Sequence, residues 1–268
     1  MRLTVLCDNN TYIDRYCIAE PAVSYLIEDG ARTVLFDAGY SEVFLENARR
    51  MGIDLARVTD IVLSHGHNDH TGGLPAFFRS FSQPVRLYAH PDAFLPKRAE
   101  GLDVGAPLSE DGLPAQVERH IGKAPRRISK NVLLLGQIPR VHAEEGCRTV
   151  GQTQRGGVWE PDPVLDDTAL LLFPPEGAFL VTGCTHAGVM NLIDHAEAQA
   201  DGRRITGLLG GLHLMEADAY AARCIGYLIQ KGVCELYPAH CVSLPVKAAL
   251  CRVCTVHEVG VSLQIAWD

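Results

Sequence analysis

The fold of this chain is decided by one stretch, Ser64-His65-Gly66-His67-Asn68-Asp69-His70-Thr71-Gly72-Gly73-Leu74. It follows the apolar run Ile61-Val62-Leu63 and precedes the apolar run Pro75-Ala76-Phe77-Phe78. Three imidazoles and one carboxylate lie within the six positions from 65 to 70, at the end of an expected strand. Imidazole nitrogens and carboxylate oxygens bind zinc and, less selectively, iron or manganese. The composition of the stretch therefore predicts a metal site.

Two adjacent half-sites are expected within this stretch. Because a strand alternates its side chains between two faces, His65 and His67 point the same way. Glycine and a turn at positions 68–69 let the chain fold back, so that Asp69 and His70 reach a second point nearby. A solvated loop that happens to be rich in histidine is the alternative, and the regular spacing favours the metal site over it.

The same residues resemble the signature of a known family. His65-x-His67-x-Asp69-His70 is similar to the HxHxDH motif of the metallo-β-lactamase superfamily. Further stretches resemble one subgroup of that superfamily: Leu3 to Asn10, Phe36 to Gly39, Thr182 to His186, Gly210 to Leu214 and Pro238 to Cys241. Members of the subgroup are described as metal-dependent hydrolases or as 7,8-dihydropterin-6-ylmethyl-4-(β-D-ribofuranosyl)aminobenzene 5′-phosphate synthases. The resemblance covers nearly the whole chain and implies the fold more specifically than the substrate.

The length and the apolar content indicate one large domain. The chain has 268 residues, of which 47% are hydrophobic, and no linker or low-complexity tract divides it. We therefore predict a single metallo-β-lactamase-like domain over 1–268. A lid or insertion is expected around 96–130, where glycine and proline recur and the apolar period weakens, with a short helix over 113–121.

The charge balance and the cysteines limit the partners and the location. The chain carries 24 basic and 32 acidic residues, which argues against a nucleic-acid surface because phosphate binding needs clustered Lys and Arg. We expect a small-molecule substrate, anionic or neutral, while the sequence leaves the oligomeric state open. With no signal-peptide pattern and no apolar run long enough to span a bilayer, no membrane partner is expected and the predicted location is cytoplasmic. The nine scattered cysteines are typical of reduced, buried thiols, and Cys251-x-x-Cys254 is assigned to packing.

Alternating strand and helix patterns predict an α/β fold. Strands are expected to end at His65, His186, His213 and His240, which would bring these side chains to one edge of one sheet. Other strands are expected over 131–141 and 259–265. The alternation in both halves predicts the four-layer αββα sandwich of two mixed β-sheets that the resemblance also implies.

The strand-end histidines complete the two predicted half-sites. A catalytic metal needs about three protein ligands and one open position. We predict that His186 joins His65 and His67 on one metal, and that His240 joins Asp69 and His70 on the other.

Cys184 departs from the pattern that the resemblance implies, because Thr182-Gly183-Cys184 stands where Thr-Gly-Asp is expected. Either Cys184 is a thiolate ligand and His186 completes the first metal, or only one of the two binds. A thiolate would favour zinc or iron. An inert buried thiol is the remaining alternative.

The other candidate residues are assigned by their context. His213 is predicted to contact substrate or transfer a proton, with metal binding or an ordinary strand-end position as alternatives. Asp37 either caps a turn or, as the resemblance implies, orients a metal-binding histidine, with equal support for each. Asp166 and Asp167 are assigned to an ordinary turn, with a place at the same edge as the strand-end histidines as the alternative. Partnerless histidines are expected at the surface or in the core: His120, His142, His195 and His257.

These assignments predict a metal-dependent hydrolase. Two metal ions, Zn²⁺ in the first place with Fe or Mn as alternatives, would turn a bridging water into hydroxide that attacks a small ester, lactone or phosphodiester. Asp69 and His213 are the predicted catalytic residues. One alternative is the pterin-pathway synthase that the resemblance implies. Another is a di-metal binding or redox protein without hydrolysis.

Overall fold

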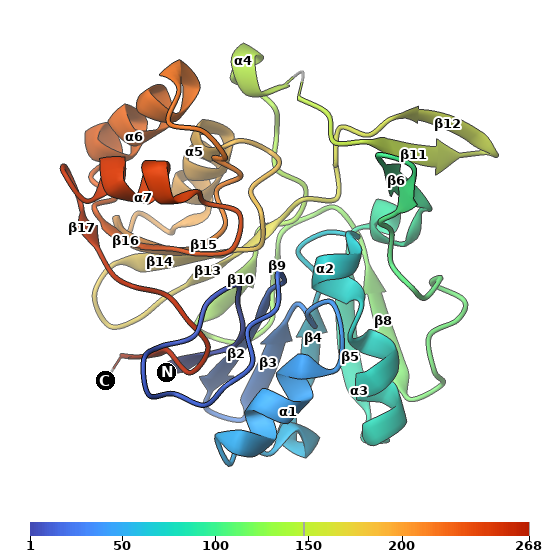
Figure 1. The fold of residues 1–268 in the computed structure, drawn as a ribbon. Helices are drawn as coiled ribbons and strands as arrows, with labels where there is room; N and C mark the ends of the chain where they lie inside the picture. The colour runs from blue at the N-terminus through green and yellow to red at the C-terminus, as the bar shows by residue number, and fades with distance from the viewer. Residues whose placement is uncertain (147, 268) are drawn as a thin grey trace. The chain divides into compact units, whose positions relative to one another are not determined.

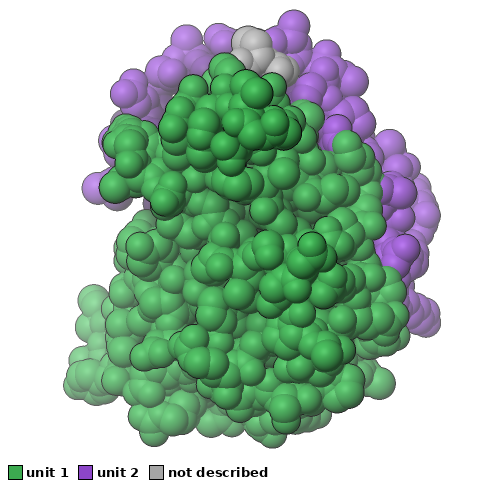
Figure 2. Space-filling model, turned by 90° about the vertical axis from the view of Figure 1, so that its right-hand side faces the viewer, with its two compact units in different colours: residues 1–123, 149–166, 260–267 green, residues 124–148, 167–259, 268 purple. Residues whose placement is uncertain are grey.

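The computed structural model describes residues 1–146 and 148–267 of the chain. It divides into two compact units, coloured separately in Figure 2. Unit 1 comprises residues 1–123, 149–166 and 260–267, and unit 2 comprises residues 124–148 and 167–259. Within the described ranges, no helix is long and apolar enough to cross a membrane.

A seven-stranded mixed sheet forms the centre of unit 1 (Figure 1). Its strands lie in the order β18 (Gln264–Ala266), β1 (Arg2–Cys7), β2 (Ser24–Asp29), β3 (Arg32–Phe36), β4 (Asp60–Val62), β5 (Val85–Ala89) and β8 (Val117–Ile121). The strands from β18 to β3 pair antiparallel, and those from β3 to β8 pair parallel. The helical segments of unit 1 are α1 (Val43–Arg50), η1 (Leu55–Arg57), α2 (Asn68–Thr71), α3 (Leu74–Ser80) and η2 (Pro91–Phe94).

Unit 1 also contains a small four-stranded sheet. Its order is β12 (Val158–Pro161), β11 (Gln152–Arg155), β6 (Lys97–Ala99) and β7 (Leu102–Asp103), and every pairing is antiparallel. Two of its strands thus come from the 96–130 region that the sequence marks as a lid or insertion. The boundaries of that insertion and of a single domain stay predictions.

A second seven-stranded mixed sheet forms the centre of unit 2 (Figure 1). Its strands lie in the order β17 (Thr255–Val256), β16 (Glu235–Pro238), β15 (Ile205–Gly210), β14 (Ala178–Thr182), β13 (Ala169–Leu172), β10 (Val132–Leu134) and β9 (Arg126–Arg127). The four from β17 to β14 pair parallel, and the rest pair antiparallel. The helices of unit 2 are α4 (Ala143–Gly146), α5 (Val189–Gln199), α6 (Ala219–Lys231) and α7 (Leu244–Leu250).

Each unit has its own apolar core between helices and one face of its sheet. In unit 1 the register aligns Leu26, Leu35, Ile61 and Leu87 across four strands, and Phe77 of α3 belongs to the same buried cluster. Fully burying one such side chain contributes roughly 1.5–3 kcal/mol. This packing fixes the position of β4, whose end carries the metal-binding stretch.

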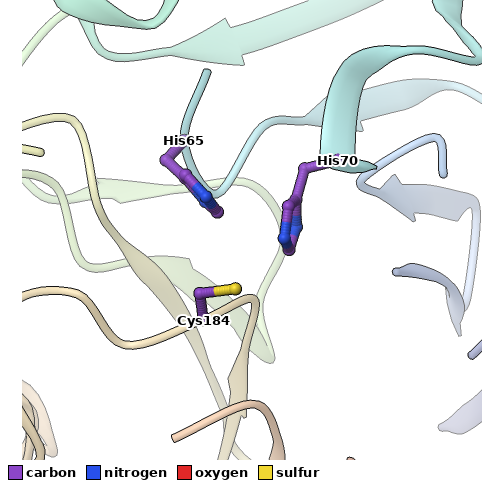
Figure 3. A group of neighbouring side chains, drawn as sticks. All are labelled: His65, His70 and Cys184. Carbon is purple, nitrogen blue, oxygen red and sulfur yellow. The ribbon is translucent and has the colours of Figure 1, made fainter. Parts of the chain in front are cut away.

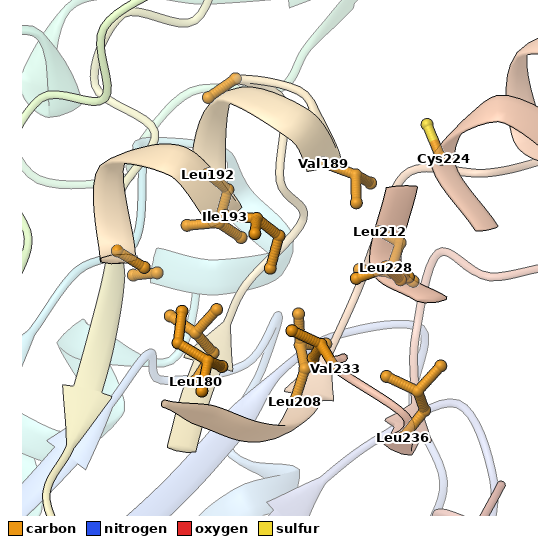
Figure 4. Packing of buried hydrophobic residues seen from close by; sticks show 14 of the residues in the cluster. Leu180, Val189, Leu192, Ile193, Leu208, Leu212, Cys224, Leu228, Val233 and Leu236 are labelled. Carbon is orange, nitrogen blue, oxygen red and sulfur yellow. The ribbon is translucent and has the colours of Figure 1, made fainter. Parts of the chain in front are cut away.

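The core of unit 2 is built in the same way (Figure 4). Leu180, Leu208 and Leu236 lie side by side on three parallel strands. They belong to one cluster with Leu192 of α5 and Leu228 of α6. The three strands are therefore held in register, and their carboxyl ends meet at one edge of the sheet.

The structure confirms the α/β class with two mixed sheets but corrects one part of the sequence analysis. His186, His213 and His240 follow the adjacent parallel strands β14, β15 and β16. His65 follows β4, which belongs to the sheet of unit 1. The expectation that all four histidines end strands of one sheet is wrong, because β4 finds its partners in β3 and β5.

Several predicted elements also differ. The short helix over 113–121 is wrong: residues 117–121 form β8, because the parallel edge of β5 offers them a ladder of hydrogen bonds. The strand over 131–141 ends at Leu134, and Gly136 follows with a positive φ of 69°. The strand over 259–265 is confined to residues 264–266, since Ser262 turns the chain at φ 81°. The turn predicted at 68–69 is the start of the one-turn helix α2.

Candidate metal centre

The metal-binding stretch of unit 1 leaves β4 as a tight loop. A Cβ atom at Gly66 would come within 2.1 Å of the backbone oxygen of Ala93, so only glycine fits there. His65 Nε2 lies 2.9 Å from His67 Nδ1, and the rings of His65 and His70 have centroids 4.2 Å apart. Figure 3 shows the side chains of His65 and His70, together with Cys184 of unit 2. The loop therefore brings its three imidazoles close together, while their division between two adjacent half-sites stays a prediction.

Asp37 fixes the orientation of His70. The Oδ2 atom of Asp37 lies 2.7 Å from Nδ1 of His70, and both side chains are fully buried. The same carboxylate accepts hydrogen bonds from the backbone N–H and the hydroxyl of Ser64, each at 2.7 Å. Because an ionised carboxylate only accepts, Nδ1 of His70 carries the proton and Nε2 keeps its lone pair. Of the two interpretations of Asp37, the structure supports the orienting one.

Ser64 extends this network to His65, a role that the sequence analysis missed. Its hydroxyl oxygen lies 2.9 Å from Nδ1 of His65 while its proton is donated to Asp37. The oxygen therefore accepts the Nδ1 proton of His65, and Nε2 of that ring keeps its lone pair. The sequence signal that could have indicated this role is the position of Ser64 directly before the first histidine of the motif. One buried carboxylate thus sets the tautomers of two candidate ligands.

Burial keeps His67 neutral. The side chain lies in a nearly closed environment, and burial is the largest cause that lowers the pKa of His67 to about 4. The nearby Asp69 and Asp166 oppose the shift, whereas Lys97 and His70 add to it. At neutral pH the imidazole of His67 therefore carries a lone pair that a cation can use.

Asp69 is the exposed member of the set. Its Oδ2 atom lies 3.6 Å from Nε2 of His70, and its side chain is 29% exposed. It opens onto a cavity of about 330 Å³ in unit 1, lined also by Pro21, Tyr40, His67, Asn68, Ala99, Val104 and Val150. A molecule in this cavity would reach the carboxylate of Asp69.

The donor set in unit 1 fits a metal ion. Two nitrogen ligands of a tetrahedral zinc, each about 2.05 Å from it, lie about 3.3 Å apart. The separation of 2.9 Å between His65 Nε2 and His67 Nδ1 is close to that value. Neutral imidazoles and a carboxylate are also the ligands that zinc, iron and manganese take. The residues present could therefore hold such a cation.

A buried ion-pair cluster contacts the backbone of the loop that carries His65 and His67. Lys97 Nζ lies 2.7 Å from Asp162 Oδ2 and 3.0 Å from Asp166 Oδ1, and all three side chains are at most 1% exposed. The other oxygen of Asp166 accepts a hydrogen bond of 2.7 Å from the backbone N–H of Gly66. Asp166 lies in a turn, as predicted, but the interpretation as an ordinary turn residue is incomplete, because its side chain also holds the candidate metal-binding loop. The sequence hid this contact because 100 positions separate the two residues.

In unit 2 the candidate residues gather at the ends of three adjacent parallel strands. Thr185, His213 and His240 follow β14, β15 and β16, and each has a positive φ, of 61°, 48° and 48° respectively. Such backbone costs a non-glycine residue about 1–3 kcal/mol and often occurs at functional sites. The rings of His186 and His213 lie close, with centroids 4.5 Å apart.

Two cysteines join His240 at this edge. One ligand atom from each of Cys184, His240 and Cys241 lies within 4.8 Å of the others. Cys184 is buried, at 3% exposed. Of the predicted ligands of unit 2, Cys184 lies close to His240, and the ring of His186 lies close to that of His213, the predicted catalytic residue. The choice between Cys184 and His186 as a ligand stays open, and the sequence analysis missed Cys241.

Asp167 plays the same part in unit 2 that Asp166 plays in unit 1. Its Oδ2 atom accepts a hydrogen bond of 2.8 Å from the backbone N–H of Ala187, directly after His186. The turn assignment of Asp167 is therefore incomplete, because the side chain holds a loop that carries a candidate ligand.

The remaining histidines have structural partners that their sequence context did not show. His142 lies 2.8 Å from Asp194, and His195 lies 2.9 Å from the backbone oxygen of Leu135. Two more stack on tyrosines within their own units: His120 on Tyr88 and His257 on Tyr237.

The two mixed sheets and the clustered histidine, carboxylate and thiol side chains define the class: an α/β protein with a candidate metal centre. A family model, the metallo-beta-lactamase superfamily, matches residues 18–199, so the chain belongs to that superfamily. Tm1679, described as a metal-dependent hydrolase of the beta-lactamase superfamily, has a crystal structure similar over 100% of both chains, with a TM-score of 0.86 and 28% identity. These matches confirm the predicted fold class.

Curated relatives come from Methanocaldococcus jannaschii. An uncharacterized protein, MJ0448, is 31% identical over 227 residues, which cover 84% of each chain. A 7,8-dihydropterin-6-methyl-4-(beta-D-ribofuranosyl)-aminobenzene-5'-phosphate synthase is 27% identical over 216 residues, covering 75% of this chain and 73% of the synthase. The predicted resemblance to that subgroup is therefore confirmed.

Proposed function

We propose that this protein is a metal-dependent hydrolase that acts on a small ester, lactone or phosphodiester. The observation that carries the proposal is the set of donors in unit 1, in which Asp37 and Ser64 orient the lone pairs of His65 and His70. The similarity to a metal-dependent hydrolase over the whole chain supports the same class of reaction.

The residues divide between two cations. His65 and His67 would hold one with His186, and Asp69 and His70 would hold the other with His240. Metal ions bound there would supply Lewis acidity and would lower the pKa of water. Zinc suits these ligands best, with iron and manganese as alternatives.

The protein side chains would position the reactants and move protons. Asp69 combines a place among the ligands with exposure to the cavity of unit 1, so its carboxylate can orient the attacking water and accept its proton. His213, at the edge formed by the strands of unit 2, would protonate the leaving group. The substrate would be a small molecule, anionic or neutral.

Substitution of Asp69 tests this proposal. We expect Asp69→Ala to lower turnover by about 10²–10⁴-fold, the usual contribution of a positioned acid or base. The measurement is hydrolysis of bis(para-nitrophenyl) phosphate, para-nitrophenyl acetate and a simple lactone by zinc-loaded protein. The control is Asp111→Ala, whose side chain is fully exposed. Loss of the circular-dichroism spectrum would show unfolding, whereas full turnover by a folded Asp69→Ala would contradict the proposal.

The identity to a pterin-pathway synthase favours one second candidate. In that reaction the site would join an aminobenzene ribose phosphate to a dihydropterin diphosphate and release diphosphate. Incubation of the metal-loaded protein with both substrates, followed by mass spectrometry, tests it. Condensation without hydrolysis of any ester, lactone or phosphodiester would replace the hydrolase. Two redox-active irons per chain with neither reaction would instead indicate a di-metal redox protein.

A further inference from the structure

We infer that Cys241 is a metal ligand, and that it binds, with Cys184, the cation that His240 holds in the proposed centre. This inference rests on the proposed function and deepens it, because two sulfur donors would hold that cation with His240 in place of Asp69 and His70. Three protein ligands then leave one position open, and the carboxylate of Asp69 keeps its proposed role as acid and base. Thiolates select zinc or iron(II) and disfavour magnesium and manganese. The three side chains are contributed by unit 2 alone.

The arrangement of the three donor atoms is the first observation. One atom from each of Cys184, His240 and Cys241 lies within 4.8 Å of the other two. Ligands that share one zinc, with Zn–S of about 2.3 Å and Zn–N of about 2.0 Å, lie about 3–4 Å apart. Small side-chain rotations would therefore bring both sulfurs and the imidazole onto one ion.

The end of β15 is shaped around the sulfur of Cys241. A Cβ atom at Gly211 would lie 2.5 Å from that sulfur and 2.4 Å from the backbone oxygen of Gly183, so no side chain fits at this position. The carbonyl of Gly211 accepts hydrogen bonds from the hydroxyls of Thr182 and Thr185, at 2.9 and 2.7 Å. Gly211 is therefore held in place, and the thiol of Cys241 occupies the space beside it.

The polar contacts of Cys241 suit a thiolate. Its sulfur accepts a hydrogen bond of 3.3 Å from the backbone N–H of His213. As a thiol it donates to the backbone oxygen of Cys184 at 3.7 Å. Metal binding would replace the second contact, because the S–H proton leaves, and would keep the first, because an N–H donor stabilises a negative sulfur.

Cobalt substitution tests the inference. Cobalt(II) bound by thiolate absorbs strongly in the near ultraviolet through charge transfer from sulfur, and the intensity follows the number of Co–S bonds. We expect this absorption in the Co²⁺-loaded wild-type chain, about half of it in Cys241→Ser and in Cys184→Ser, and none in the double variant. The matched control is Cys254→Ser, another half-buried cysteine of unit 2, which should keep the full absorption. Full intensity in a folded Cys241→Ser, or no charge-transfer absorption in the wild type, would overturn the inference.

A second measurement needs no substitution. Zinc should protect Cys241 of the wild-type chain from alkylation during brief exposure to iodoacetamide without denaturant, as mapped by peptide mass spectrometry; Cys241 is the half-buried thiol of the pair. The reference is the same chain treated with a chelator. We expect alkylation of Cys241 to slow at least tenfold when zinc is present. Equal labelling of Cys241 with and without zinc, or a disulfide between Cys184 and Cys241 that zinc does not prevent, would contradict sulfur ligation.

The two proposals fail in different ways. If the reaction class is wrong, the charge-transfer absorption and the thiol protection remain while no ester, lactone or phosphodiester is hydrolysed. If the sulfur ligands are wrong, hydrolysis remains in a protein whose cobalt spectrum shows no bond to Cys241.

Discussion

At the scale of single residues, the candidate centre depends on side chains that fix the state of their neighbours. Asp37 accepts three hydrogen bonds, and in this way it determines which nitrogen of His70 is protonated. The sequence marks the histidines by their spacing, but it cannot tell an orienting aspartate from a turn residue. The distinction depends on the contact between Asp37 and His70, which are 33 positions apart in the sequence and meet only in the folded chain.

Substitution of Asp37 should weaken metal binding without removing a ligand. In Asp37→Asn the side chain can no longer accept the proton of His70 and both donors of Ser64, so the tautomers are no longer fixed. Loss of such an orienting partner typically lowers metal affinity about 10–100-fold. Zinc affinity can be measured by competition with a chromophoric chelator, with Asp111→Asn as the exposed control. An unchanged affinity would mean that Asp37 serves the fold alone.

At the scale of elements, the sequence predicts those elements whose signals are local. The hairpin of β2 and β3 follows from Asp29-Gly30 between two apolar runs, and α5 follows from its helical spacing. Strand β8 could not be predicted in this way, because its conformation is set by pairing with β5. The residues that support the metal-binding loop could not be predicted for the same reason. Lys97 forms ion pairs with Asp162 and Asp166, which lie far from it in the sequence.

Removal of Lys97 should destabilise unit 1 strongly. Lys97→Met leaves the carboxylates of Asp162 and Asp166 buried without their cation, and such a change costs about 3–5 kcal/mol. The free energy of unfolding from urea titration checks this value. The control Arg119→Met removes an exposed ion pair with Asp111 and should change stability by less than about 1 kcal/mol. Similar losses in both variants would show that burial of the cluster does not matter.

Two glycine substitutions should have opposite effects. At Gly66 a Cβ atom would clash with the backbone of Ala93, so Gly66→Ala must displace the metal-binding loop and should lower both stability and zinc affinity. At Gly226, inside α6, a Cβ atom has no heavy atom within 4 Å among its described neighbours. Gly226→Ala should therefore stabilise the protein by about 0.5–1 kcal/mol through helix propensity. Thermal unfolding of both variants, with and without zinc, distinguishes the two effects.

At the scale of the whole molecule, the peptide between Asp166 and Asp167 is one of the places where the chain passes between unit 1 and unit 2. Each of the two side chains holds a loop of its own unit, one through Gly66 and the other through Ala187. The sequence shows which residues can bind metal, because ligand chemistry is local. It cannot show how the ligands are shared between two cations, because that partition depends on tertiary structure.

Substitution of His240 tests the partition directly. If His240 binds one cation while His65 and His67 bind the other, the zinc content of His240→Ala should fall to about one ion per chain after dialysis. The wild-type chain should keep two. Plasma mass spectrometry of the dialysed protein gives the count. The control His257→Ala, which removes a ring stacked on Tyr237 in the same unit, should keep both ions. Because a ligand at about 100 times its Kd stabilises the folded state by about 2.7 kcal/mol, the lost zinc should also lower the unfolding temperature. Two zinc ions in a folded His240→Ala protein would refute the partition.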